Sequence, residues 1–159
     1  MRFQLCCWTK PLSNLINVDR ENFGQEIVAD INKKWTWAKN ASAEHILIED
    51  GLEHVDSTEH FLLEAERVLQ TKGALEVRVP HFKNPSAYRF THRHYFSYSL
   101  FSHFPEPHDK TKRLRVESIR LIVDKRFPLS LLDILANLFP NVWERFFYVS
   151  GLHVILRKV

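Results

Sequence analysis

Short apolar runs bounded by polar or turn-forming residues recur along the chain, and each run predicts a β-strand. Continuous apolar runs of this length are typical of strands that are buried on both faces of a parallel sheet. The expected strands cover residues 3–7, 16–19, 26–31, 45–49, 74–79, 113–123 and 152–156. The pattern therefore predicts a sheet that runs through the whole sequence.

Residues 56–70 have the clearest helical pattern. Asp56 can cap this helix, and Glu59 follows three residues later, as in a capping box. Gly73 lies just beyond the expected end, where helices often stop. The apolar face at helical spacing comprises Phe61, Leu62, Ala65, Val68 and Leu69. A second amphipathic helix is expected over 128–138. Helices between strands predict an α/β domain in which strands 45–49 and 74–79 are parallel.

The segment 83–107 interrupts this alternation and is rich in aromatic residues. Because large rings need burial, we expect an ordered excursion from the domain rather than a linker. The rings concerned are Tyr88, Phe90, Tyr95, Phe96, Tyr98, Phe101 and Phe104. The same segment is a candidate cover for a substrate site.

Composition narrows the class of protein. The chain has 159 residues, of which 45% are hydrophobic and 26% charged, and this predicts one folded domain over 1–159. No apolar run approaches the roughly 18 residues of a membrane span. The first residues lack the features of a signal peptide, and the adjacent Cys6 and Cys7 cannot join distant segments. We therefore expect a cytoplasmic protein with reduced cysteines.

A net charge of +3 is too small to indicate a nucleic-acid partner by itself. The second half of the chain contains a stripe of basic residues: Lys110, Lys112, Arg113, Arg115, Arg120, Lys125 and Arg126. Acidic residues at Asp109, Glu117 and Asp124 dilute it, so a solvated strand face is favoured over a nucleic-acid surface.

Six short motifs occur in one order along the chain. They are FQLCCWTKP at 3–11, NVD at 17–19, VAD at 28–30, GLEHV at 51–55, RVLQTKG at 67–73 and VPH at 79–81. In this order they resemble the motifs of small S-adenosylmethionine-dependent methyltransferases of the Rossmann-like kind. The stretch 84–104 resembles the segment that follows the fifth strand in that family. The resemblance covers nearly the whole chain.

The resemblance implies a minimal three-layer Rossmann-like methyltransferase fold, a mostly parallel sheet with an antiparallel C-terminal strand. It implies S-adenosylmethionine as cofactor and methyl transfer to a small-molecule acceptor. Asp19 matches the residue that binds the ribose hydroxyls, and Asp30 matches the one near the adenine. Glu49 and Asp50 lie where the methionine end of the cofactor meets the acceptor. The remaining predicted cofactor-binding residues are Leu5, Cys6, Cys7, Trp8, Ile31 and Gly51.

The chain departs from the family at the first loop, where Cys6 and Trp8 replace two glycines. Glycine there allows torsions that other residues resist, and the Trp8 ring is large enough to fill the space for the methionine moiety. An alternative is therefore a catalytically degenerate binding or scaffold subunit, as a homodimer or with an active methyltransferase. Only 13 residues separate Cys6 from Asp19, so the first crossover helix is expected to be absent or about one turn long.

Nine histidines are more than usual, and three of them, His54, His81 and His92, match the family's motifs. His81 and His92 are the candidate catalytic residues, as bases that deprotonate the acceptor, with a structural hydrogen-bonding role as the alternative. A zinc site on His81, His92 and His94 lacks a further ligand at a suitable spacing, so no metal is predicted.

Several other motif residues have a simple structural alternative. Asp19 and Asp30 are also typical of turn residues at strand ends. Cys6 and Cys7 are interpreted as small buried residues rather than reactive thiols. The four tryptophans, Trp8, Trp35, Trp37 and Trp143, are expected to pack in the core or at its edge.

Overall fold

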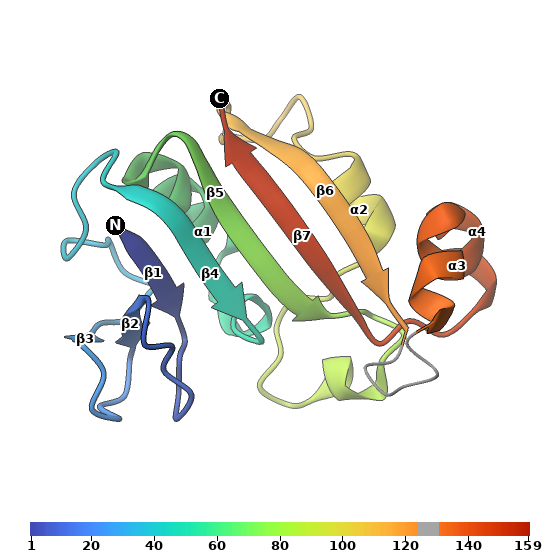
Figure 1. Cartoon of the computed structure of the whole chain (residues 1–159), viewed down its shortest axis with the longest axis horizontal. Coiled ribbons are helices and arrows are strands. Elements are labelled where there is room, and N and C mark those ends of the chain that lie inside the picture. The colour runs from blue at the N-terminus through green and yellow to red at the C-terminus, as the bar shows by residue number, and fades with distance from the viewer. Residues whose placement is uncertain (124–130) are drawn as a thin grey trace.

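The computed structural model describes residues 1–123 and 131–159, and its seven strands form one sheet. The strand order is β3-β2-β1-β4-β5-β7-β6 (Figure 1). The strands are β1 (Arg2–Leu5), β2 (Ile16–Asp19), β3 (Ile27–Val28), β4 (Ala43–Glu49), β5 (Leu69–Pro80), β6 (Leu114–Ile122) and β7 (Gly151–Lys158). All seven predicted strands are present, with ends shifted by a few residues.

The sheet is parallel from β3 to β5, and β7 runs antiparallel between β5 and β6. This arrangement confirms the predicted α/β fold with a mostly parallel sheet and an antiparallel C-terminal strand. Because parallel strands end at the same edge, the segments that follow β1, β2, β3 and β4 meet there.

Helices occur mainly in the second half of the chain. They are α1 (Thr58–Val68), α2 (Tyr98–Ser102), α3 (Leu132–Leu138) and α4 (Pro140–Phe146), with short 3-10 turns η1 (Leu52–His54) and η2 (Pro85–Tyr88). Figure 1 shows α1 and α2 behind the sheet, with α3 and α4 beyond edge strand β6. The expected helix over 128–138 is present as α3, and its first residues lie outside the described part. Among the described residues, no helix combines the length and apolar character needed to cross a membrane.

The limits of α1 differ from the prediction. Ser57, not Asp56, is the cap, because the Ser57 side-chain oxygen accepts a hydrogen bond from the backbone of His60 at 3.2 Å. The helix ends at Val68, since Leu69 already pairs with Ala43 in the sheet. Gly73 is therefore a buried residue inside β5 rather than the end of a helix. Tertiary pairing has overridden the local stop signal.

The crossover from β1 to β2 contains no helix, as the short spacing predicted. Two buried polar side chains hold this loop in place instead. Gln4 and Asn17 each accept a hydrogen bond from the backbone N–H of Leu12 at 2.9 Å. Gln4 also donates to the Lys10 carbonyl, and Asn17 donates to that of Leu15. These side chains satisfy backbone groups that a helix would otherwise satisfy internally.

The segment 29–42 lacks a helix as well, and aromatic rings take its place against the core. Trp35 is fully buried, stacks on Trp37 and meets Phe61 of α1 edge to face. Glu64 of α1 accepts the backbone N–H of Trp35 at 2.7 Å, and Arg67 donates to the Trp35 carbonyl at 2.9 Å. The packing role predicted for Trp35 is confirmed. The same prediction is wrong for Trp8, which is 60% exposed.

The excursion over 83–107 is only partly packed. Phe96 and Phe101 are buried, and Tyr98 and Phe104 lie against the same core. The prediction that all its rings are buried is wrong, because Tyr88, Phe90 and Tyr95 are exposed. These exposed rings lie in the half of the excursion that follows β5 directly and contains η2.

Candidate functional site

The predicted cofactor residues gather at the carboxyl edge of the sheet. Residues 6–8 follow β1, Asp19 ends β2, Asp30 follows β3, and residues 49–51 lie at the end of β4. Adjacent strand pairing brings these four ends together, which is the place where open α/β sheets bind ligands.

The loop after β1 keeps a glycine-like backbone without glycine. Cys6 has a φ of 56° and Trp8 a φ of 44°, both in the left-handed region. The backbone N–H of Trp8 donates to Asp19 Oδ2 at 2.8 Å, and that of Glu21 donates to Asp19 Oδ1 at 3.1 Å. Each carboxylate oxygen can accept more than one hydrogen bond, so Asp19 retains capacity for a ligand.

Cys6 fills space beside the end of β4. A Cβ built on Gly51 would lie 2.8 Å from Cys6 Cβ, so the Cys6 side chain occupies the room that Gly51 leaves. Burial, together with the nearby Asp19 carboxylate, raises the pKa of the Cys6 thiol to about 12. Burial also raises the pKa of Cys7. Both side chains therefore fit the predicted role of small packed residues rather than nucleophiles.

The other predicted cofactor residues are of two kinds. Leu5 and Ile31 have buried side chains that belong to the hydrophobic core, so these side chains pack under the carboxyl edge of the sheet and do not face solvent there. Asp30 is half-buried, and its Oδ1 accepts the backbone N–H of Asn32 at 2.9 Å, which is the turn role weighed for it. Glu49 lies 3.5 Å from the Arg78 guanidinium of β5.

His81 is fully buried and both of its ring nitrogens are engaged. Nε2 lies 2.7 Å from Glu144 of α4, and Nδ1 accepts the backbone N–H of Lys83 at 3.1 Å. Burial lowers the pKa of His81, although Glu144 opposes the shift. These contacts fit the structural hydrogen-bonding role that was the alternative for His81, because the ring ties the end of β5 to α4.

His92 lies in a different place, together with two residues that the sequence did not single out as site residues. Its Nδ1 lies 3.0 Å from the Ala87 carbonyl, and its ring meets the His54 ring edge to face. Burial, and then the proximity of His54, lower the pKa of His92. Glu53 is 1% exposed, and its Oε2 has no hydrogen-bond partner among the residues that the structure describes. Burial raises the pKa of Glu53 to about 7, and Asp50 adds to the shift.

The three histidines weighed as zinc ligands are not assembled in the structure. His81 is bound to Glu144, and His94 Nε2 lies 2.8 Å from the Val55 carbonyl. Among the described residues, the group of close ligating side chains is instead Glu53, His54 and His92. The motif GLEHV contained the first two, but only the fold brings His92 to them.

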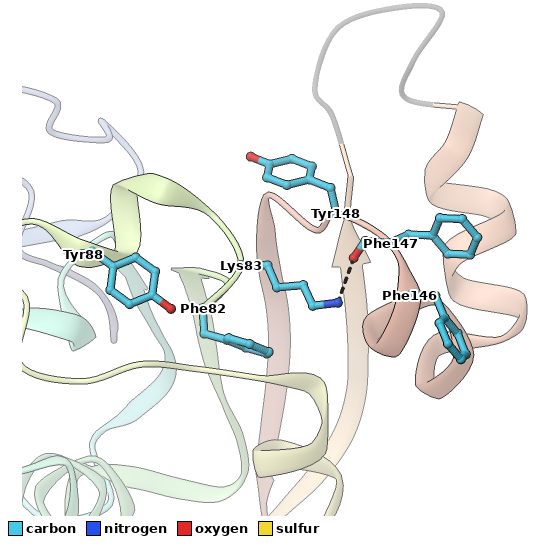
Figure 2. Close-up of a pocket in the computed structure, with 6 residues that line it drawn as sticks. All are labelled: Phe82, Lys83, Tyr88, Phe146, Phe147 and Tyr148. Atoms are coloured by element: carbon cyan, nitrogen blue, oxygen red, sulfur yellow. Dashed lines mark hydrogen bonds between the residues drawn. The ribbon is translucent and has the colours of Figure 1, made fainter.

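A separate pocket of about 430 Å³ lies beyond β5. Its lining, shown in Figure 2, comprises Phe82, Lys83, Tyr88, Phe146, Phe147 and Tyr148. The Lys83 ammonium donates to the carbonyl of Phe147 at 3.1 Å and to that of Arg145 at 3.1 Å. Lys83 therefore satisfies carbonyl groups at the end of α4. It lies in the pocket between Phe82 and Tyr88 and the aromatic residues 146–148.

Comparison with solved structures identifies the fold. An S-adenosylmethionine-dependent methyltransferase from Mesorhizobium loti superposes with a TM-score of 0.62 at 12% identity, over 99% of this chain and 90% of that one. The chain has the fold of these methyltransferases. A chain from a complex of the Haloferax volcanii Trm112 methyltransferase activator matches with a TM-score of 0.66 at 12% identity, over 98% of this chain and 81% of that one.

The methyltransferase fold alone does not fix the reaction. The [4+2]-cyclase SpnF matches with a TM-score of 0.62 at 11% identity, over 98% of this chain and 73% of that one. No protein-family model and no curated protein matches the chain. The activity must therefore be argued from the residues at the site.

Proposed function

We propose that this protein transfers the methyl group of S-adenosylmethionine to a small acceptor. The observation that carries the proposal is the backbone after β1, where Cys6 and Trp8 adopt left-handed torsions. Such torsions cost roughly 1–2 kcal/mol for residues other than glycine. Strain of this kind persists where the surrounding structure imposes it, and it clusters at ligand sites. The left-handed torsions of Cys6 and Trp8 therefore support a cofactor loop at this edge of the sheet.

Each residue at this edge has a part in the proposal. Asp19, which already accepts the Trp8 N–H, orients the ribose hydroxyls and holds the loop to β2. Asp30 lies at the end of β3 for the adenine side, and Glu49 and Asp50 lie at the end of β4 for the acceptor side. The sulfonium supplies a reactive methyl group, so these residues have mainly to align the acceptor and exclude water.

The acceptor side extends over residues 83–107. Proton removal from an acceptor falls to His92, whose Nδ1 is held by the Ala87 carbonyl and whose Nε2 lone pair is free. We also infer a single domain over 1–159 and a cytoplasmic location, supported by the single sheet and the free cysteines.

Calorimetric titration with S-adenosylmethionine and S-adenosylhomocysteine tests the proposal. We expect micromolar binding that Asp19→Ala abolishes and that the neighbouring control Arg20→Ala leaves unchanged, because Arg20 is exposed and pairs with the exposed Glu21. Absence of binding at millimolar concentrations of either compound would refute the cofactor assignment. With binding established, methyl transfer is measured against a panel of small hydroxyl, thiol and amine acceptors.

A second candidate function, a binding subunit without catalysis, is favoured by the surface of α3 and α4. Apolar side chains there are exposed together, and such patches mark interaction sites. They are Leu131, Ile134, Leu135, Leu138, Phe139, Val142 and Phe146, called the α3–α4 patch below. In this case the partner is a second copy or an active methyltransferase.

Restoring glycine in the first loop separates the two functions. The double variant Cys6→Gly, Trp8→Gly suits the observed torsions, since both φ values lie in the left-handed region. A native protein that does not bind S-adenosylmethionine, together with a double variant that does, would support the binding subunit. Binding by the native protein supports the enzyme.

A further inference from the structure

Glu53, His54 and His92 bring three ligating atoms within 4.8 Å of one another. Two of the residues come from η1, directly after β4, and the third comes from the excursion after β5. The sequence separates His54 from His92 by an entire helix and strand. The backbone N–H groups of Arg93 and His94 both donate to the Glu53 carbonyl, at 2.8 and 3.3 Å, and this pairing fixes the two segments together.

The two imidazoles are oriented in the way that metal ligands usually are. His54 Nδ1 lies 3.0 Å from the Thr91 carbonyl, and His92 Nδ1 lies 3.0 Å from the Ala87 carbonyl. A ring that donates from Nδ1 to a carbonyl has its lone pair on Nε2, which is the arrangement that fixes the tautomer of a ligating histidine. The rings meet edge to face with centroids 4.6 Å apart.

The carboxylate supplies an independent observation. Glu53 is 1% exposed, yet within residues 1–123 and 131–159 its buried Oε2 has no hydrogen-bond partner. A buried carboxylate oxygen without a partner is costly, and buried charges are normally paired or bound to metals. His54 is exposed, so the site is open to solvent on one side.

We propose that Glu53, His54 and His92 form a binding site for a divalent transition-metal ion of the zinc type. Two histidines and one glutamate are a known ligand set for zinc sites that keep a further position open. Bonds of about 2.0–2.2 Å require the ligand atoms to approach to roughly 3.4 Å, so metal binding involves small side-chain rotations of all three residues. The ion compensates the unpartnered Glu53 oxygen.

This inference stands on these side chains and does not depend on methyl transfer. The metal site and the methyl transfer also give His92 different roles, because an Nε2 atom that binds a metal ion cannot accept a proton from the methyl acceptor. Binding of zinc without binding of S-adenosylmethionine would refute the proposed enzyme and leave the metal site. Binding of S-adenosylmethionine without binding of zinc would refute the metal site and leave the proposed enzyme.

The test uses the full chain, without a histidine tag, after treatment with a chelator. Co²⁺ titration is followed by visible d–d absorption, and Zn²⁺ binding is followed by calorimetry and by displacement of Co²⁺. We expect one ion per chain. Glu53→Gln, His54→Ala and His92→Ala should each weaken binding by at least about tenfold. Glu53→Gln is nearly isosteric, and circular dichroism establishes that each variant is folded.

Two matched controls define the result. His103→Ala removes an exposed histidine whose Nδ1 also contacts a carbonyl, that of Ser99, at 2.7 Å, and it should leave metal binding unchanged. Cys6→Ser tests whether a thiol is a ligand. An unchanged Co²⁺ spectrum excludes the Cys6 thiol, whereas the absorption of a Cys6 thiolate complex would disappear in this variant. The site is refuted if a folded protein binds no Co²⁺ or Zn²⁺, or if folded Glu53→Gln, His54→Ala and His92→Ala bind as well as His103→Ala.

Discussion

Individual side chains at the carboxyl edge show how closely this fold is packed around its first loop. Cys6 has a left-handed backbone, and its side chain occupies the space beside Gly51 of the next loop, which has no side chain. The two positions are coupled: a side chain at one requires its absence at the other. The sequence shows both residues, but their contact comes from the pairing of β1 with β4.

Gly51→Ala should therefore destabilise the protein. Its Cβ would lie 2.8 Å from Cys6 Cβ and 3.0 Å from Ile48 Cγ1, so the backbone must shift, at a cost of about 1–3 kcal/mol. Urea denaturation measures the change in free energy of unfolding. Cys6→Gly in the same chain should recover part of the loss, because it removes the closest contact. Equal losses with and without Cys6→Gly would contradict the coupling.

The buried His81 predicts a pH dependence of stability. Burial lowers its folded-state pKa below the ordinary value of about 6.5. As the pH falls below that value, the unfolded chain takes up a proton that the folded protein does not, so the contribution of His81 to stability declines with acidification. Glu53, whose pKa burial raises to about 7, contributes in the opposite direction, so the part due to His81 is the difference between the native protein and a His81 variant. The decline begins near pH 6.5 and ends once the folded-state pKa is passed.

Chemical denaturation between pH 8 and pH 5 measures this effect. His81→Gln should remove that part of the decline, because glutamine does not titrate, although it lowers stability at pH 8 through loss of the Glu144 contact. His103→Ala serves as the exposed control and should keep the full slope. A slope unchanged by His81→Gln would assign the titration to another group.

At the scale of elements, polar side chains take the place of helices in the crossovers that precede β4. Gln4 and Asn17 support the loop after β1, and Glu64 and Arg67 of α1 hold the segment 29–42. Arg67 donates to the carbonyls of Trp35 and Ala38 and to the side chain of Asn40. One helix thus fixes a long irregular segment against the core.

Arg67→Ala should loosen this segment. The variant removes several hydrogen bonds donated by a charged group and leaves the half-buried Glu64 without its ion-pair partner. We therefore expect the free energy of unfolding to fall by about 2–4 kcal/mol. Hydrogen exchange should show the backbone amides of 35–42 opening sooner. Arg20→Ala, at an exposed pair with Glu21, should change stability by less than about 0.5 kcal/mol. Similar effects of the two variants would contradict the role given to Arg67.

Helix α3 covers part of the exposed edge of strand β6. The Asn137 side chain of α3 accepts the backbone N–H of Leu121 and donates to its carbonyl, both at 2.8 Å. It therefore imitates a neighbouring strand on β6, and an edge covered in this way is less available for pairing with another chain. The amphipathic pattern predicted the helix, but nothing in the sequence indicated that it lies at the edge of the sheet.

The molecule as a whole combines a well-packed sheet with an exposed apolar surface at one end. Leu131, Leu135 and Leu138 follow one another at helical spacing on α3 and are all exposed. A surface of this kind is seldom left uncovered in a stable monomer.

We expect self-association through the α3–α4 patch. Sedimentation velocity should show a species heavier than the monomer that grows with concentration, and Leu135→Glu with Leu138→Glu should return the protein to the monomer. Leu100→Glu, on an exposed leucine of α2, is the matched control and should not change the distribution. A wild-type protein that stays monomeric at high concentration would refute self-association.

The sequence by itself determined the strands, the α/β class and the residues that end each parallel strand. These follow from local patterns: apolar runs for strands, helical spacing for α1 and polar residues at strand ends such as Asp19. The resemblance to methyltransferases then supplied the mostly parallel sheet with an antiparallel C-terminal strand, whereas the strand order came only from the structure. The missing helix between β1 and β2 was also predictable, because chain length limits what a crossover can hold.

Only the tertiary structure decided which side chains meet. His81 and His92 carry the same chemistry, yet one is buried against Glu144 and the other faces Glu53 and His54. Likewise, Trp35 is buried and Trp8 is exposed, and α1 ends where Leu69 joins the sheet. Contacts between residues far apart in the chain depend on packing and strand pairing, so a local pattern can name the chemical groups without determining their partners.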